Sequence, residues 1–145
     1  IYNFGEKWIV WEKENLEERK KFFADEEKIN FGSLTLEKKN FTKEDYEIKK
    51  NNDIAAIDGE KIIFPLTLRY WQEGDFFYPI SKKRFRKNVS DFLNDLKVIL
   101  PKRKKIVVLG NNNGDIIWVV GLRLDDRFKV TEKTKKIIEY KIVNS

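Results

Sequence analysis

The chain has 145 residues, a net charge of +6 at pH 7, and 41% hydrophobic residues, which is enough for one ordinary domain or two small ones with a packed core. It contains neither cysteine nor histidine, so a disulfide framework, a cysteine nucleophile, a zinc site and a Ser-His-Asp hydrolase are excluded for these residues. No apolar stretch approaches the roughly 18 residues of a membrane helix and no signal peptide is visible, so we expect a cytoplasmic location and no membrane partner.

Charge is distributed unevenly along the chain. Residues 1–60 contain 11 basic and 15 acidic residues, whereas residues 61–145 contain 19 basic and nine acidic ones. A basic C-terminal part is typical of a domain that binds a polyanion such as nucleic acid, and it is equally compatible with a solvated basic surface. The change of sign places the best candidate domain boundary near residue 55. The absence of any methionine indicates a piece cut from a longer protein.

Strands dominate the predicted elements of the N-terminal part. The aromatic and β-branched run at 7–13 predicts a strand, and the charged segment 14–23 predicts a short helix or a loop. Residues 28–38 alternate apolar and polar side chains around a glycine, which indicates a strand pair or a bulged strand. Residues 54–57 begin another strand, and the Asp58-Gly59 pair that follows is a hairpin turn signal.

The next segment leads from a strand into a strongly basic run. Residues 61–71 alternate in hydrophobicity and predict a strand, in which Pro65 favours an edge position or a bulge. Glu73-Gly74-Asp75 has the composition of a turn. Five of the six residues at 82–87 are basic, and an amphipathic pattern follows them at once.

That pattern predicts one clear helix at about 88–98. Asn88 or Ser90 can cap its N-terminus, and Asp91 lies in the first turn, where the helix dipole favours a negative charge. The apolar stripe of this helix consists of Val89, Phe92, Leu93 and Leu96. Pro101 and the basic run after it are expected to close the segment.

The remaining residues return to strands. Residues 106–109 and 116–120 have the composition of buried strands, and the Gly110–Asp115 loop between them predicts a hairpin. Two further strands are predicted at 123–130 and 136–143. The pattern as a whole predicts an α+β fold that is mainly antiparallel β with one clear helix.

Asp91, Asp95 and Lys97 resemble the acidic set with a lysine that holds Mg²⁺ in many nucleases. That chemistry usually places the acidic-x-Lys triplet on a strand, where residues two apart share a face. The apolar spacing here is helical, so Lys97 points away from the face that the two aspartates share. We therefore interpret both aspartates as surface and helix-dipole residues, and we expect no catalytic residue and no metal site in this chain.

Three basic groups are candidates for contact with nucleic acid: residues 82–87, residues 102–105, and a group after residue 122. Tyr78 and Phe85 lie close to the first group in sequence. Basic residues mixed with aromatics can hold phosphates and stack on bases. The alternative is a set of solvated loops with Phe85 in the core.

Four motifs carry a resemblance to a known family: Leu68-Arg69-x-Trp71-x-x-Gly74-Asp75-x-Phe77, Ser90-Asp91-Phe92, Trp118-Val119-x-Gly121-x-Arg123, and Arg127-Phe128-Lys129-Val130-Thr131. In their order and spacing, they resemble the C-terminal region of the tRNA(Ile)-lysidine synthases. One stretch departs from the family pattern. At positions 80–88 the family usually has a glycine-containing turn followed by lysines, and this chain keeps the basic residues without the glycines.

The resemblance implies an intact parent that is an ATP-dependent carbon-nitrogen ligase of tRNA processing. Such an enzyme adenylates the wobble cytidine of an isoleucine tRNA and joins lysine there. The family's ATP site is a Ser-Gly-Gly-x-Asp-Ser loop in an N-terminal catalytic domain, and these 145 residues do not contain it. ATP and Mg²⁺ are therefore implied for that domain, with no cofactor in this chain, which alone is expected to be inactive. Its implied partners are tRNA(Ile), its own N-terminal catalytic domain and, because family members are often dimers, a second copy.

By the same resemblance, residues 1–54 are the end of a linking domain, and residues 55–145 are a C-terminal tRNA-binding domain that docks the acceptor-stem side. The residues expected to contact RNA are Lys82, Lys83, Arg84, Arg86, Lys87, Arg123, Arg127 and Lys129. The alternative is a stand-alone nucleic-acid-binding or protein-interaction β domain without catalysis. Arg69 and Asp75 are expected to pair or cap structurally, and we assign Trp71, Phe92 and Trp118 to the core.

Overall fold

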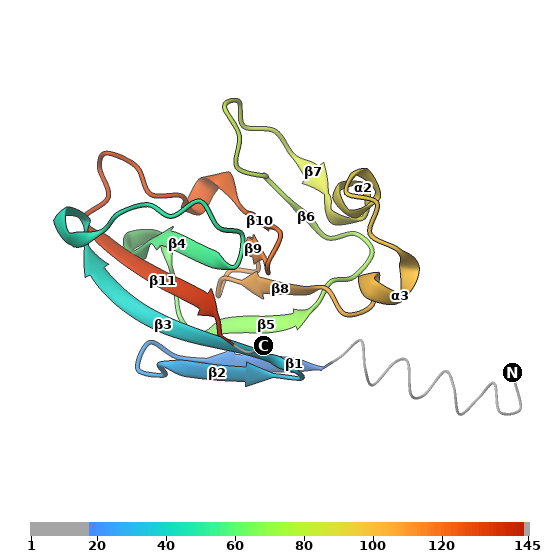
Figure 1. Ribbon diagram of the computed structural model, residues 1–145, viewed down its shortest axis with the longest axis horizontal. Coiled ribbons are helices and arrows are strands. Elements are labelled where there is room, and N and C mark those ends of the chain that lie inside the picture. The colour runs from blue at the N-terminus through green and yellow to red at the C-terminus, as the bar shows by residue number, and fades with distance from the viewer. Residues whose placement is uncertain (1–17, 144–145) are drawn as a thin grey trace, which may run out of the picture.

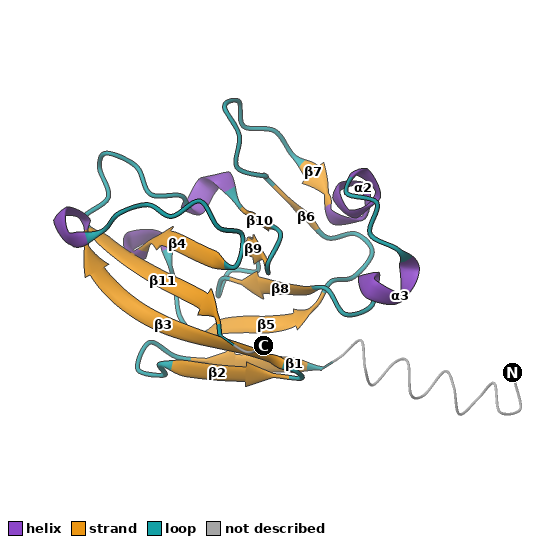
Figure 2. Ribbon diagram, in the orientation of Figure 1, coloured by secondary structure: helices purple, strands orange, loops and turns teal. Residues whose placement is uncertain are grey.

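The computed structural model in Figure 1 describes residues 18–143, and strands dominate it (Figure 2). The first sheet has the strand order β1 (Arg19–Phe22), β5 (Leu66–Tyr70), β8 (Val107–Gly110), β9 (Ile116–Val119) and β10 (Arg123–Leu124). The second has the order β2 (Lys28–Phe31), β3 (Leu34–Thr42), β11 (Lys136–Ile142) and β4 (Ile54–Asp58). The short strands β6 (Phe76–Phe77) and β7 (Lys87–Asn88) form a separate pair. Every pairing is antiparallel.

The main helix is α2 (Val89–Asp95), and a second, shorter one is α3 (Leu100–Arg103). Three short 3₁₀ helices complete the described elements: η1 (Lys43–Asp45), η2 (Gly59–Lys61) and η3 (Asp126–Phe128). The predicted fold class, mainly antiparallel β with one clear helix, is therefore confirmed.

The hydrophobic core has two parts, one on each face of the first sheet. The larger cluster joins the two sheets, since Leu68 and Trp118 from the first sheet lie in it with Leu36 and Tyr140 from the second. The smaller cluster lies under α2 and contains Phe77, Val89, Phe92, Leu93, Val108, Ile116 and Val119. Because both faces of β9 are covered, all four of its residues are buried, as the unbroken apolar run had indicated.

The predicted domain boundary near residue 55 is wrong for the described part of the chain. Strand β1 pairs with β5, and β3 pairs with β11 along seven residue pairs. A cut after residue 54 would therefore divide both sheets and the larger core cluster. The charge asymmetry that motivated the boundary is a surface property, and it is independent of how the strands pair.

Several local predictions need correction. The strand at 7–13 lies outside the described residues, and the segment 14–23, predicted as helix or loop, contains the strand β1. Asp58-Gly59 forms no hairpin, because the Asp58 side chain accepts a hydrogen bond from the Glu60 N–H at 3.1 Å and starts η2. Pro65 precedes β5, which lies between β1 and β8 and is thus not an edge strand.

The predicted strand at 123–130 is also mostly wrong. It ends after two residues, because the Asp125 side chain accepts a hydrogen bond from the Arg127 N–H and caps η3. The predicted strand pair at 28–38 and the hairpin at 110–115 are confirmed.

Helix α2 is confirmed but is shorter than predicted. Asn88 is its N-cap residue without a side-chain hydrogen bond, so the capping interaction expected from the sequence is absent at that residue. Lys97 has a positive φ of 58°, and the chain turns there, which leaves Leu96 43% exposed instead of in the apolar stripe. Pro101 does not end a segment, because it lies in the first turn of α3.

The structural roles predicted from the motifs are confirmed. Arg69 donates two hydrogen bonds of 2.9 Å to the two carboxylate oxygens of Asp75. Asp75 also accepts the Gln72 N–H at 2.7 Å, and it thereby closes the predicted turn. Phe92 and Trp118 are buried in the core. Trp71 packs against the smaller cluster, and its indole N–H donates to the Arg103 carbonyl at 2.7 Å.

Candidate nucleic-acid interface

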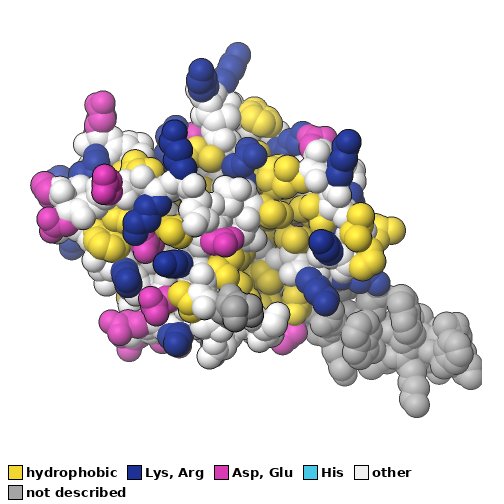
Figure 3. All heavy atoms as spheres, viewed as in Figure 1, with side chains coloured by type: hydrophobic (Ala, Val, Ile, Leu, Met, Phe, Trp, Pro, Cys, Tyr) yellow, Lys and Arg dark blue, Asp and Glu magenta, His cyan; other side chains and the backbone are white. Residues whose placement is uncertain are grey.

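Residues 80–87, which we call the basic loop, run from the connection after β6 to Lys87, the first residue of β7, and project from the body of the molecule (Figure 1). Lys and Arg side chains gather at the tip of this projection (Figure 3). The loop is held at its base, where the Ile80 N–H donates to the Leu124 carbonyl at 2.9 Å and the Asp126 N–H donates to the Tyr78 carbonyl. A projecting loop on a rigid base is a geometry that suits contact with a large polyanion.

Three of the five basic residues predicted in this loop are engaged within the protein. Arg84 donates to the buried Asp126 carboxylate at 2.8 Å. The Arg86 guanidinium lies 3.9 Å from the centroid of the Phe76 ring, and Lys87 forms an ion pair with Asp95 on α2. These contacts tether both sides of the loop, and the Lys87 pair accounts for one of the two aspartates of α2. Phe85 is 47% exposed, so the alternative that placed it in the core is wrong.

Lys82 and Lys83 occupy the tip of the basic loop, and both are exposed. Within residues 18–143, neither ammonium group has a carboxylate oxygen within ion-pair distance. At the tip, the Ser81 hydroxyl donates a hydrogen bond to the Lys83 carbonyl at 2.8 Å. Two lysines without internal partners can neutralise phosphates without first breaking a contact in the protein.

The third basic group consists of Arg123, Arg127 and Lys129, and all three side chains make contacts within the protein. The Arg127 guanidinium donates to both oxygens of Asp125, at 3.0 and 2.9 Å, and lies 4.4 Å from the centroid of the Tyr78 ring. Burial disfavours the charged guanidinium, but the hydrogen bonds and charge of Asp125 outweigh it and raise the pKa of Arg127. Arg123 lies 5.3 Å from the Phe92 ring centroid, and Lys129 donates to Asp126 at 2.8 Å. The predicted RNA contacts of these three residues stay predictions.

Asp126 joins the first and third basic groups, because Arg84 and Lys129 donate to its two oxygens. Burial acts to raise the pKa of this carboxyl, but the two cations outweigh burial and lower it. A lowered carboxyl pKa stabilises the fold above the unfolded-state pKa, which for aspartate is about 4, and this stabilisation is lost as the pH falls.

We therefore predict that Asp126→Asn lowers the free energy of unfolding by about 2 kcal/mol at neutral pH, because two charge-assisted hydrogen bonds are weakened. The difference from the wild type should shrink as the pH falls below about 4, where the carboxyl of the unfolded wild type becomes protonated while that of the folded state still carries its charge. Urea unfolding at pH values from neutral to about 2.5 would test this. A constant difference across that range would contradict the role of the Asp126 charge.

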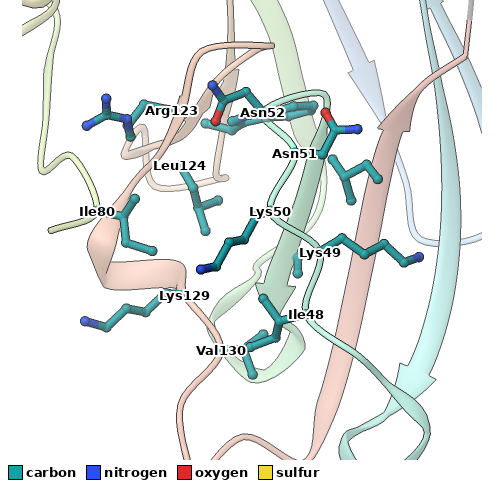
Figure 4. A pocket seen from close by; sticks show the side chains of 13 residues that line it. Ile48, Lys49, Lys50, Asn51, Asn52, Ile80, Arg123, Leu124, Lys129 and Val130 are labelled. Carbon is teal, nitrogen blue, oxygen red and sulfur yellow. The ribbon is translucent and has the colours of Figure 1, made fainter.

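Near the base of the basic loop lies a cleft of about 440 Å³ (Figure 4). One wall is the loop segment 48–52, and the opposite wall contains Ile80 and residues of β10 and the segment after η3. Its lining residues are Ile48, Lys49, Lys50, Asn51, Asn52, Ile54, Ala56, Ile80, Trp118, Arg123, Leu124, Lys129 and Val130. The cleft brings Arg123 and Lys129 together with Ile80 of the basic loop, whereas Lys102–Lys105 do not line it.

Sequence reasoning missed Lys49, Lys50, Asn51 and Asn52. They belong to the mildly acidic N-terminal part, which was assigned to a linking domain, and no periodic pattern marks them. They reach the cleft because β4 pairs with β11, and β11 is the strand that follows η3 and its basic residues. The one available signal was local: two lysines and two asparagines in a row within an otherwise acidic segment.

Within the described residues, no group of three or more carboxylate, imidazole or thiol side chains is arranged to hold a metal ion. No helix in that part of the chain has the length and apolar character needed to span a bilayer. The cleft and the tip of the basic loop offer cations, amides and apolar side chains, which suits binding of an anionic partner.

Known proteins resemble this chain in sequence and in fold. Residues 66–140 match the model of the family described as the TilS substrate C-terminal domain. The chain is 40% identical over 123 residues to the tRNA(Ile)-lysidine synthase of Parabacteroides distasonis, covering 83% of this chain and 28% of that protein. It is 36% identical over 110 residues to the tRNA(Ile)-lysidine synthase of Bacteroides thetaiotaomicron, covering 76% of this chain and 25% of that one. The chain thus spans about a quarter of the length of these relatives.

Solved structures show the same architecture. A crystal structure described as the TILS C-terminal domain superposes with a TM-score of 0.70 and 19% identity, covering 88% of this chain and all of that one. An N-terminal fragment of the phenylalanyl-tRNA synthetase β-subunit from Pyrococcus horikoshii gives a TM-score of 0.52 and 16% identity, covering 61% of this chain and 27% of that one. At these identities the similarity concerns the fold alone.

The two packed sheets, the helix and the family match define the class of this chain, a substrate C-terminal domain. The chain belongs to the tRNA(Ile)-lysidine synthase family, and it corresponds to the C-terminal part of those proteins. The family predicted from the four sequence motifs is therefore confirmed.

Proposed function

We propose that this chain is the tRNA-docking part of an ATP-dependent ligase that attaches lysine to the wobble cytidine of an isoleucine tRNA in the cytoplasm. The observation that carries the proposal is the basic loop, whose tip presents Lys82 and Lys83 without internal ion pairs. The names of the relatives supply the enzyme and its tRNA. ATP and Mg²⁺ would be held by the catalytic part of the parent, and this chain alone would be inactive.

The docked region is, in this proposal, a double-stranded part of the tRNA on the acceptor-stem side. A-form RNA is recognised mainly through its shape, its phosphates and its 2′-hydroxyl groups. Lysines at the tip of a projecting loop can follow a phosphate backbone without reading bases. Arg84, Arg86 and Lys87 would hold the loop in shape and would add positive potential behind the tip.

The exposed apolar corner between α2 and α3 supports a contact with the parent's own N-terminal catalytic domain. Leu96, Ile99 and Leu100 are 43%, 60% and 73% exposed. Hydrophobic side chains are visible on this side of the molecule in Figure 3. Exposed apolar residues that lie together are typical of contacts between proteins or domains. In this proposal they pack against another part of the parent rather than against RNA.

The test is direct binding of the chain to an isoleucine tRNA transcript, followed by fluorescence anisotropy. We expect the affinity to fall about ten- to a hundredfold between about 50 and 200 mM salt, since each phosphate contact releases counterions. An oligo-U strand of similar length should bind more weakly than the folded tRNA. Equal binding of oligo-U would favour a stand-alone single-strand binder. Absence of RNA binding would favour the protein-interaction alternative and would overturn the proposal.

A further inference from the structure

The cleft beneath the basic loop has the composition of a binding site for an anion that carries a flat apolar group. The side chains of Ile48, Ile54, Ile80, Leu124 and Val130 supply its apolar surface. Its cations are Lys49, Lys50, Arg123 and Lys129, its amides are Asn51 and Asn52, and no carboxylate lines it. The chain has 24 acidic residues, but none of them is among the lining residues of this cleft of about 440 Å³. The charge of the lining is therefore complementary to that of an anion.

Among the described residues, Lys50 and Arg123 are the two cations of this cleft without a carboxylate partner, and Arg123 lies over the Phe92 ring, which leaves Lys50 as the lysine available to a ligand. Figure 4 shows its side chain extending from the loop at 48–52 toward the opposite wall, while Lys49 points away. Lys49 forms an ion pair with Glu139 at 3.0 Å, and Lys129 forms one with Asp126 at 2.8 Å. Among residues 18–143 no carboxylate oxygen lies within ion-pair distance of Lys50. Its ammonium group can therefore meet a phosphate without losing a partner.

Both walls of the cleft are fixed before any ligand arrives. On one side, Glu139 is buried and accepts hydrogen bonds from the Tyr46 hydroxyl at 2.8 Å and from Lys49 at 3.0 Å. Burial and the hydrogen bond to Glu139 raise the pKa of Tyr46, so this hydroxyl stays a donor at neutral pH. On the other side, Ile80 is held by the Leu124 carbonyl. A preformed cleft loses little entropy when it binds.

We propose that this cleft takes one unpaired nucleotide of the bound RNA, with its base against the aliphatic walls and its phosphate on Lys50. The proposal rests on the proposed function, since it concerns the same RNA. A base inside a duplex is stacked and cannot enter a cleft of this size, whereas a base at a single-stranded end can. Asn51 and Asn52 can hydrogen-bond the polar edge of such a base. An acidic peptide would meet the cations but would leave the apolar walls without a partner.

The position of the cleft fits this ligand. Ile80 belongs both to the cleft wall and to the basic loop, and Lys82 and Lys83 follow it closely in the chain. A duplex that ends at the loop tip would therefore have its unpaired nucleotides next to the cleft. The unpaired nucleotide and the duplex would then be held by adjacent surfaces, and their contributions to affinity can be measured separately.

The experiment compares a blunt RNA hairpin with the same hairpin carrying a four-nucleotide 3′ overhang, using the 145-residue chain. We expect the overhang to increase affinity about tenfold, the equivalent of one well-held nucleotide. Lys50→Gln and Ile48→Asp should each remove most of this gain and bind the blunt hairpin as tightly as their matched controls do. The matched controls are Lys28→Gln on β2 and Ile63→Asp. Both controls are exposed and lie outside the cleft, and they should keep the gain.

The outcomes separate this inference from the proposed function. If the blunt hairpin binds and the overhang adds nothing, or if the gain survives in both cleft variants, the cleft assignment is overturned and the docking role stands. If the overhang binds through Lys50 while the blunt stem does not bind, the cleft is supported and the duplex-docking role is overturned. Displacement of the overhang by equal concentrations of a mononucleotide or of poly-glutamate would overturn RNA as the occupant.

Discussion

Replacing Asp125 with alanine is expected to lower the free energy of unfolding by about 3–5 kcal/mol, enough to unfold much of the protein at moderate temperature. Asp125 is fully buried, and its two oxygens accept four hydrogen bonds. The donors are the Tyr78 N–H at 2.9 Å, the Arg127 N–H at 2.8 Å and two guanidinium nitrogens of Arg127 at 3.0 and 2.9 Å. The substitution leaves these donors without their acceptor and removes the cap of η3.

Urea unfolding followed by tryptophan fluorescence measures this loss, and Asp115→Ala is the matched control. Asp115 pairs with the same arginine, but at 3.4 Å and with 39% of its side chain exposed. Removing it should cost less than about 1 kcal/mol, because exposed ion pairs contribute little. Equal losses in the two variants would contradict the central role of Asp125. The comparison also shows that Arg127 is unsuitable for testing RNA contact, since changing it would disturb the same buried group.

Reversing the charge of both lysines at the tip, Lys82→Glu with Lys83→Glu, is expected to weaken tRNA binding about a hundredfold at low salt. The slope of log affinity against log salt should fall by about two, because two phosphate contacts are lost. Since both side chains are exposed and form no ion pair within residues 18–143, the melting temperature should stay close to that of the wild type. Anisotropy titrations over a salt series provide the affinities, and thermal unfolding checks the fold.

The control is Lys20→Glu with Lys21→Glu on β1, which changes the net charge equally at two adjacent exposed lysines of another surface. It should reduce affinity only through the general loss of positive charge, by less than about tenfold. Similar losses in the two double variants would mean that the net charge, and not the basic loop, holds the RNA. Unchanged binding in the loop variant would remove the loop tip from the interface.

The sequence was most informative where one residue type has one physical role. The apolar runs of β8 and β9 required burial on both faces, and the asparagines and glycines between them required a tight turn. Arg69 and Asp75 were expected to pair because an arginine in a strand beside an acidic turn needs a partner, and they do. The family motifs rest on such residues, so they identified the family even though the chain spans only about a quarter of the length of the relatives it matches.

The pairing of strands that are distant in sequence could not be predicted, because hydrophobic alternation shows which face of a strand is buried but not which strand lies beside it. The pairing of β4 with β11 therefore escaped prediction, and with it the placement of Lys50 near Lys129. Charge is similarly ambiguous in a sequence. Arg127 and Lys82 look alike there, but Arg127 is neutralised by a buried carboxylate, whereas Lys82 is exposed at the loop tip without such a partner.

The position of β11 has a consequence for how the chain acquires its structure during synthesis. Among the described strands β11 is made last, but it lies between β3 and β4, which have no pairing with each other. Until it emerges from the ribosome, both strands carry unpaired edges and the larger core cluster stays open to water. Folding must therefore wait for contacts between the two ends of the described chain, which makes it slow relative to a protein built from local hairpins. The interval before closure is when the nascent chain is most exposed to aggregation and most dependent on chaperones.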